Sequence, residues 1–166
     1  MKYVSVAVDG PAGSGKSTIT KMVAEKLGFN YVDTGAMYRA LTYNFLSNDL
    51  KELEENKIKE LLEDLDFRVE YVDGVQYVYV NDVEVSDKIR TAEVSKYTSL
   101  FAKSPAVREF LIDTQRNLAH TNNIIMDGRD IASVVLPNAD VKIFLTASVE
   151  ERARRRVLDF ERQGIE

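Results

Sequence analysis

The chain has 166 residues, and its 22 basic and 27 acidic side chains give a net charge of −5, which argues against a protein that coats nucleic acid through bulk charge. With no Cys and one His, disulfides, thiolate metal sites, a cysteine nucleophile and a His-rich metal site are excluded. No segment has the roughly 20 apolar residues that span a bilayer, and the N-terminus lacks a signal-peptide pattern, so we expect a cytoplasmic protein without a membrane or nucleic-acid partner.

The first part of the chain alternates between strand and helix patterns. A β-branched apolar run at residues 3–8 predicts a buried strand, which ends at Asp9-Gly10. Residues 16–27 have helical spacing, and Gly28 is suited to end that helix. We expect a second strand at 29–32, a helix at 36–46 and a charged, amphipathic helix at 51–65.

The middle of the chain is rich in β-forming residues. The runs 67–72, 77–80 and 83–85 are separated by the turn signals Asp73-Gly74 and Asn81-Asp82, which predicts a small antiparallel meander. The connections are too short for crossover helices, so the meander should be an insertion rather than part of a parallel sheet. Further helices are expected at 92–102, 105–119 and 149–163, and further strands at 123–127 and 141–145.

The segment between the first strand and helix fits the phosphate-binding loop pattern, Gly10-Pro11-Ala12-Gly13-Ser14-Gly15-Lys16-Ser17. Its glycines let backbone N–H groups turn toward a phosphate, and the helix N-terminus adds a favourable dipole. We expect Lys16 to reach the β- and γ-phosphates and Ser17 to ligate Mg²⁺, residues that an ordinary glycine-rich turn would not need. Asp127, which ends an apolar strand, is the expected carboxylate for Mg²⁺; a turn or cap role is the alternative.

Two more motifs follow predicted strands, Asp33-Thr34-Gly35-Ala36-Met37-Tyr38-Arg39 and Asp127-Gly128-Arg129-Asp130. Open α/β sheets bind ligands at the carboxyl ends of their strands. Arg39 and Arg129 are suited to bidentate phosphate recognition, with solvated surface ion pairs as the alternative. Because a phosphate monoester is already ionised near neutral pH, such an acceptor needs no general base, which agrees with the scarcity of His.

With these motifs the chain resembles the bacterial cytidylate (CMP) kinases, of the nucleoside monophosphate kinase group of P-loop kinases. The resemblance implies a three-layer α/β/α fold with a central parallel sheet, in which 1–62 and 103–150 form the kinase core, 63–102 an inserted monophosphate-binding subdomain and 151–166 the start of a lid. The family pattern continues beyond residue 166, so we expect the chain to lack the C-terminal segment and the strand at 141–145 to be an unpaired edge. The motifs that carry the resemblance are 9–17, 33–39, Ile89-Arg-Thr-Ala-Glu-Val94, Val107-Arg-Glu109, 127–130, 141–145 and Glu150-Glu-Arg152.

The resemblance further implies transfer of the γ-phosphoryl group of Mg-ATP to CMP or dCMP, with Lys16, Arg39 and Arg129 neutralising charge on the transferring group. Thr34, Arg39 and Arg129 would bind the acceptor phosphate. Ser99, Arg108 and Asp130 would read cytosine, whose N4 amino group suits a carboxylate acceptor. The residues expected at ATP are Gly10, Pro11, Ala12, Gly13, Ser14, Gly15, Lys16, Ser17, Thr18, Arg152 and Arg156.

Alternatives remain for several of these assignments. Ser99 and Arg108 have the composition of an ordinary helix surface as much as of a binding site. In the last helix, Arg152, Arg155 and Arg156 share a face suited to a triphosphate. Glu150 and Glu151, four residues before Arg154 and Arg155, also predict a solvated, salt-bridged face. For the whole chain, the alternatives are a nucleotide-binding fragment or module without turnover and a P-loop kinase for another phosphate-bearing acceptor. We expect a monomer.

Overall fold

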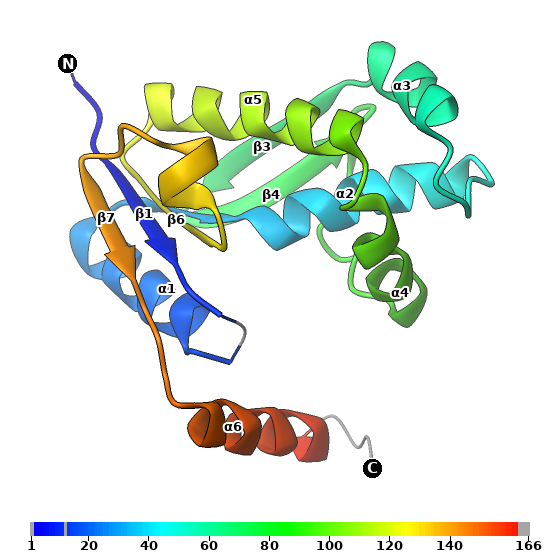
Figure 1. Cartoon of the computed structure of the whole chain (residues 1–166). Helices are drawn as coiled ribbons and strands as arrows, with labels where there is room; N and C mark the ends of the chain where they lie inside the picture. Colours follow the sequence, from blue (N-terminus) through cyan, green and yellow to red (C-terminus); the bar gives the residue numbers. More distant parts are fainter. Residues whose placement is uncertain (1, 12, 163–166) are drawn as a thin grey trace. The chain divides into compact units, whose positions relative to one another are not determined.

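The computed structural model describes residues 2–11 and 13–162, with the backbone alone at 156 and 159–162. The chain divides into two compact units, which are described separately. Unit 1 comprises Met1–Tyr31 and Asn122–Glu166, and unit 2 comprises Val32–Thr121. Figure 1 shows the course of the chain through both. The predicted division into core, inserted subdomain and lid has other boundaries and stays a prediction.

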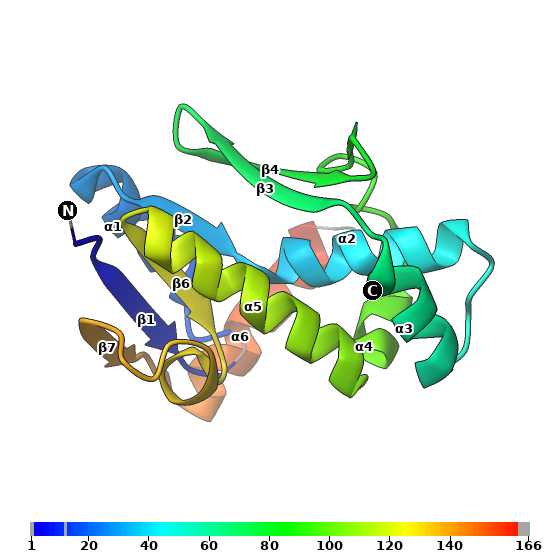
Figure 2. The same cartoon turned by 90° about the horizontal axis from the view of Figure 1, so that it is seen from above.

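Unit 1 is built on a parallel sheet. Strand β1 (Ser5–Asp9) pairs in parallel with β6 (Ile124–Gly128) and with β7 (Val141–Phe144). The strand order is β2-β6-β1-β7, with β2 at Asn30–Asp33 (Figure 2). Val6, Ala7 and Val8 are buried, as expected for the apolar strand of a covered sheet. The parallel sheet with its helices confirms the predicted α/β class.

Three helical segments belong to unit 1. Helix α1 (Lys16–Leu27) packs against β6, where its Ala24 joins Val6, Val8 and Ile125 in an apolar cluster. Gly28 ends the helix at φ 65°, a left-handed conformation that glycine adopts without strain, as predicted. The others are a short π-helix, η1 (Ile131–Val135), and α6 (Val149–Arg162).

Strand β7 lies at one edge of the sheet, as expected from the sequence. Its side chains are exposed, Phe144 to 71%. An exposed apolar edge strand is a site where further pairing is favourable.

Unit 2 combines helices with the antiparallel meander. Its helices are α2 (Thr34–Ser47), α3 (Glu55–Glu63), α4 (Ala92–Phe101) and α5 (Pro105–Thr121). The meander consists of β3 (Phe67–Val72), β4 (Val75–Val80) and β5 (Val83–Glu84), which pair antiparallel in that order. Figure 2 shows β3 and β4 alongside α2. The predicted meander is therefore confirmed.

The core of unit 2 lies where the meander meets α2 and α4. Val78 and Val80 of β4 pack with Ala40 of α2 and Val94 of α4. On α2 the apolar residues Met37, Leu41 and Phe45 have helical spacing and are fully buried. Helix α5 begins after Ser104, whose hydroxyl accepts a hydrogen bond from Val107 N at 3.2 Å and thereby caps the helix N-terminus.

The helix predicted at 51–65 is shorter in the structure, where α3 covers Glu55–Glu63. Asp49 adopts a left-handed φ of 57°, and the N–H of the buried Leu50 donates to Phe45 O at 3.0 Å. The chain is thereby turned at the end of α2, so the residues that follow are held out of a helix despite their spacing. Across the described residues, no helix combines the length and apolar character needed to cross a membrane.

Candidate functional site

The predicted phosphate-binding loop connects β1 to α1. Gly10, Gly13 and Gly15 have φ values of 153°, 75° and 87°, which L side chains rarely adopt. A Cβ on Gly10 would lie 1.9 Å from Leu145 O, so this position admits glycine alone. Ala12 lies outside the described residues. The backbone conformation fits a loop whose N–H groups turn toward an anion.

The loop contains polar side-chain atoms both with and without a hydrogen-bond partner among the described residues. Lys16 Nζ donates to Pro11 O at 3.1 Å, and burial lowers the pKa of Lys16 while the carboxylate of Asp127 opposes that shift. Ser14 Oγ is buried and, among the described residues, finds no hydrogen-bond partner. A buried, unsatisfied hydroxyl is costly, so a ligand oxygen at this place would be favourable.

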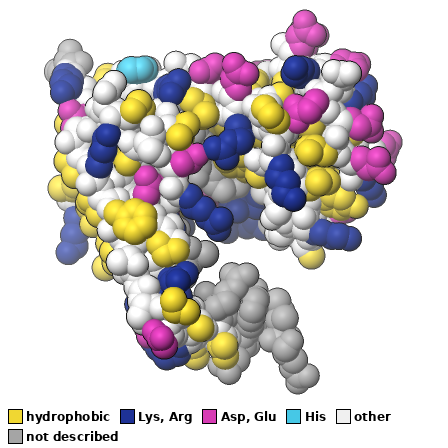
Figure 3. All heavy atoms as spheres, viewed as in Figure 1, with side chains coloured by type: hydrophobic (Ala, Val, Ile, Leu, Met, Phe, Trp, Pro, Cys, Tyr) yellow, Lys and Arg dark blue, Asp and Glu magenta, His cyan; other side chains and the backbone are white. Residues whose placement is uncertain are grey.

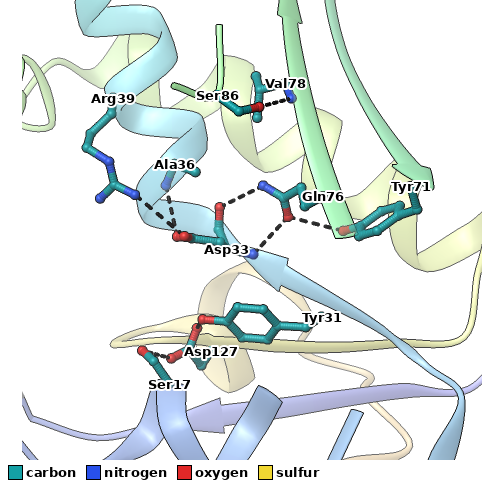
Figure 4. A network of polar contacts seen from close by, with 10 residues as sticks. All are labelled: Ser17, Tyr31, Asp33, Ala36, Arg39, Tyr71, Gln76, Val78, Ser86 and Asp127. Atoms are coloured by element: carbon teal, nitrogen blue, oxygen red, sulfur yellow. Dashed lines mark hydrogen bonds and ion pairs between the residues drawn. The ribbon is translucent and has the colours of Figure 1, made fainter. Parts of the chain in front are cut away.

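Asp127 connects the loop helix to the sheet. Its Oδ2 accepts a hydrogen bond from Ser17 Oγ at 2.7 Å, and its Oδ1 accepts one from Tyr31 OH at 2.8 Å (Figure 4). Tyr31 was not predicted as a site residue, because a Tyr within a strand pattern is typical of a packing position. The structure therefore brings together the two predicted metal ligands and adds a hydroxyl that orients the carboxylate.

The donor set at this place consists of oxygens. The described residues contain no cluster of three His, Cys, Asp or Glu side chains that would hold a metal alone. One carboxylate and one hydroxyl match the way Mg²⁺ is bound in nucleotide sites, where substrate phosphates and waters complete the shell. Ser17 and Asp127 thus fit Mg²⁺.

Asp9 is a second buried carboxylate next to the loop. It directly precedes Gly10, and its two oxygens accept hydrogen bonds from Ile131 N and Ala132 N, each at 2.8 Å. The segment after β6, which carries Arg129 and Asp130, is thereby tied to the start of the phosphate loop. Arg129 is exposed and Asp130 half-buried. The link joins residues 122 positions apart, which no local sequence signal reveals.

Helix α6 lies against the phosphate loop. A Cβ on Gly13 would come within 3.3 Å of Arg152 Cβ, and Arg155 Nη1 donates to Gly13 O at 3.4 Å. Arg152 Nε is buried and unpartnered within the described part of the chain. Arg152 and Arg155 both belong to the helix face that the sequence indicates for a triphosphate, although only Arg152 of the two is named among the residues expected at ATP. The side chain of Arg156 lies outside the described residues.

The salt-bridged face that was the alternative for α6 is present as well. Glu151 Oε1 accepts from Arg155 Nε at 2.7 Å, and Glu151 Oε2 accepts from Arg154 Nε at 2.8 Å. These two guanidinium groups lower the pKa of Glu151 to about 2. Figure 3 shows acidic and basic side chains side by side on this helix. Arg155 thus contacts both Glu151 and the phosphate loop.

In unit 2, Asp33 and Arg39 frame the start of α2. Asp33 Oδ1 accepts from Ala36 N at 2.9 Å and caps the helix, while Asp33 Oδ2 lies 3.5 Å from Arg39 Nη2. A Cβ on Gly35 would lie 3.1 Å from Arg39 Nη1, so the guanidinium lies across the helix N-terminus. Thr34 is the first residue of the helix. A helix N-terminus with an Arg beside it is suited to bind phosphate.

The residues predicted to read cytosine come from different elements. Ser99 lies on α4 and Arg108 on α5, both exposed and both in unit 2, whereas Asp130 belongs to unit 1. The one His of the chain, His120, is exposed in the last turn of α5 (Figure 3). Thr18 follows Ser17 on α1.

A protein-family model described as cytidylate kinase matches residues 6–166. The chain belongs to the cytidylate kinase family. The curated cytidylate kinase of Caldicellulosiruptor bescii is 48% identical over 166 residues, which are all of this chain and 74% of that protein. Those of Bacillus subtilis and Streptococcus mutans are 47% and 50% identical, over 99% and 100% of this chain and 74% of each relative.

One solved structure, the crystal structure of TT1252 from Thermus thermophilus, is 18% identical in sequence and has a TM-score of 0.44. The match covers the whole of this chain and 75% of the TT1252 chain. The fold described above rests on the strand order and on the helices beside the sheet, without this likeness. Membership of the family agrees with the resemblance carried by the sequence motifs.

Proposed function

We propose that this cytidylate kinase family member transfers the γ-phosphoryl group of ATP to CMP or dCMP, giving CDP or dCDP and ADP. The observation that carries the proposal is the phosphate loop with its Lys16 and its Ser17–Asp127 pair, in a chain about half identical to curated cytidylate kinases. The loop is suited to a nucleoside triphosphate, and the relatives' names point to the acceptor.

On the donor side, the loop N–H groups would hold the phosphates of ATP and Lys16 would leave the Pro11 carbonyl to contact the β- and γ-phosphates. Ser17 and Asp127 would hold Mg²⁺, which when bound would neutralise part of the negative charge of the ATP phosphates. Tyr31 keeps the carboxylate of Asp127 turned toward Ser17. Arg152, Arg155 and Arg156 on α6 would add positive charge near the loop.

On the acceptor side, Thr34, Arg39 and Arg129 would bind the phosphate of CMP, whose oxygen attacks in line. Arg39 and Arg129 would also neutralise charge on the transferring group, together with Lys16. Ser99, Arg108 and Asp130 would read the base, because a carboxylate accepts from the N4 amino group that uracil lacks. No general base is needed, since the acceptor phosphate is ionised.

A coupled assay of ADP formation with CMP, dCMP, UMP, AMP and GMP tests the proposal. CMP and dCMP should support turnover and the purine monophosphates should not. Turnover with AMP or GMP but not CMP would show a kinase for another acceptor. ATP binding without ADP formation for any monophosphate would show a binding module.

We also propose that the protein acts as a monomer in the cytoplasm, where ATP and pyrimidine monophosphates are available. Sedimentation velocity should give one species near the mass of 18.8 kDa, and a concentration-dependent dimer would contradict the proposal.

A further inference from the structure

We propose that Gln76, a residue of the antiparallel meander, is a positioning residue for the acceptor-phosphate site and acts through Asp33. The inference rests on the proposed function and deepens it, because it gives the meander a defined task in binding the acceptor. The contact lies within unit 2, to which Gln76, Asp33 and Arg39 all belong.

The side-chain amide of Gln76 binds both backbone groups of Asp33. Gln76 Oε1 accepts a hydrogen bond from Asp33 N at 2.9 Å, and Gln76 Nε2 donates to Asp33 O at 3.2 Å (Figure 4). One planar amide therefore makes the pair of bonds that a neighbouring strand would make. Two bonds to a single residue fix its position and its orientation together.

The position of Gln76 in its strand is unusual for a polar residue. Side chains two apart share a face of a strand, so Gln76 lies on the same face of β4 as Val78 and Val80. Those two valines are buried against α2 and α4. A polar side chain at the end of an apolar row needs a partner, and Asp33 supplies it.

Tyr71 holds the Gln76 amide in this orientation. In the β3–β4 register Tyr71 stands opposite Gln76, and its hydroxyl donates to Gln76 Oε1 at 3.2 Å. Burial, together with the negative charge of Asp33, raises the pKa of Tyr71 above its ordinary value, so the hydroxyl keeps its proton. Oε1 then faces two donors, which leaves the NH₂ group to face the Asp33 carbonyl.

Asp33 in turn fixes the groups proposed to meet the acceptor phosphate. Its carboxylate caps α2 at Ala36 N and contacts Arg39, and Thr34 is its neighbour in the chain. A displacement of Asp33 therefore moves the helix N-terminus and Arg39 together. Small displacements at such sites have large effects on binding and rate.

The test compares Gln76→Met, which keeps the length and removes both hydrogen-bonding groups, with Ser86→Ala. Ser86 Oγ accepts from Val78 N at 3.1 Å in the same meander, so this control weakens the meander without touching Asp33. For Gln76→Met we expect a KM for CMP raised about tenfold with the KM for ATP unchanged, as for the loss of one to two hydrogen bonds. Ser86→Ala should keep both KM values. Tyr71→Phe should raise the KM for CMP less than Gln76→Met does.

Amide hydrogen exchange at Asp33 provides a second readout that does not need turnover. Exchange should be faster in Gln76→Met than in the natural protein and unchanged in Ser86→Ala. An unchanged KM for CMP in Gln76→Met, or an equal rise in Ser86→Ala, would overturn the inference while the proposed function stands. If the natural protein does not phosphorylate CMP, the proposed function fails instead. In either case, unchanged amide exchange at Asp33 in Gln76→Met would refute the inference that Gln76 holds the backbone of Asp33.

Discussion

At the residue scale, Lys16 is the cation that the phosphate loop presents to a triphosphate. Replacement by Met removes the charge and keeps the length of the side chain, so we expect kcat to fall about 10²–10³-fold, as when one preorganised donor is lost. Lys26→Met, in the last turn of α1, is the matched control and should keep full activity. A Lys16→Met protein with normal kcat would remove Lys16 from the proposed chemistry.

The hydroxyl of Tyr31 should affect the metal dependence of the reaction. Tyr31→Phe keeps the ring and removes the hydrogen bond to Asp127, so we expect about tenfold more Mg²⁺ at half-maximal activity, as for other residues that orient metal ligands. Calorimetric titration of Mg²⁺ into the ATP complex should show the same weakening. Tyr3→Phe, at an exposed position, serves as the control. An unchanged Mg²⁺ dependence would mean that the Tyr31 hydroxyl does not orient Asp127 and that the residue has a packing role alone.

The residues found from the sequence are those whose type and spacing follow a local pattern. Lys16, Ser17 and Asp127 could be predicted because a phosphate loop and a strand end fix where they lie. Tyr31 and Gln76 could not, because each acts through a side-chain contact with a residue 96 or 43 positions away. Such contacts depend on which strands become neighbours.

At the scale of elements, helix α6 has an ion-paired face and also contacts the phosphate loop. Because guanidinium groups hold the pKa of Glu151 near 2, below the ordinary 4.5, its stabilisation of the helix is complete above pH 4.5 and is lost as the pH falls toward 2. Carboxyl NMR of Glu151 should give a midpoint near 2. In an Arg154→Ala, Arg155→Ala double variant the midpoint should move toward 4.5, and an ordinary midpoint in the natural protein would contradict the ion pairs.

The helices and strands that have a clear local sequence pattern were predicted well, whereas those that depend on distant contacts were missed or misplaced. The meander follows from its β-rich runs and from turn residues, of which Asp73, Asn81 and Asp82 indeed adopt positive φ. The π-helix η1 was not predicted, because five residues carry no helical period and its first N–H groups are held by the distant Asp9. The early start of α2, at Thr34 rather than 36, reflects the cap made by Asp33.

At the scale of the whole molecule, the residues proposed to read cytosine come from both units. Asp130 belongs to unit 1, and Ser99 and Arg108 to unit 2. If Asp130 accepts from N4 of cytosine, Asp130→Ala should lower kcat/KM for CMP about 10- to 100-fold relative to UMP, with ATP binding unchanged. Glu109→Ala, at an exposed position of α5, is a surface control. Equal losses for CMP and ATP would argue against base reading by Asp130.

The central claim is that this chain moves a phosphoryl group from ATP to CMP. Phosphorus NMR of the purified protein with Mg²⁺, ATP and CMP follows substrates and products in one experiment. The account predicts that CDP and ADP appear in equal amounts, and that Lys16→Met slows both about 10²–10³-fold. ADP that forms together with inorganic phosphate and without CDP, or no change in either nucleotide, would contradict it.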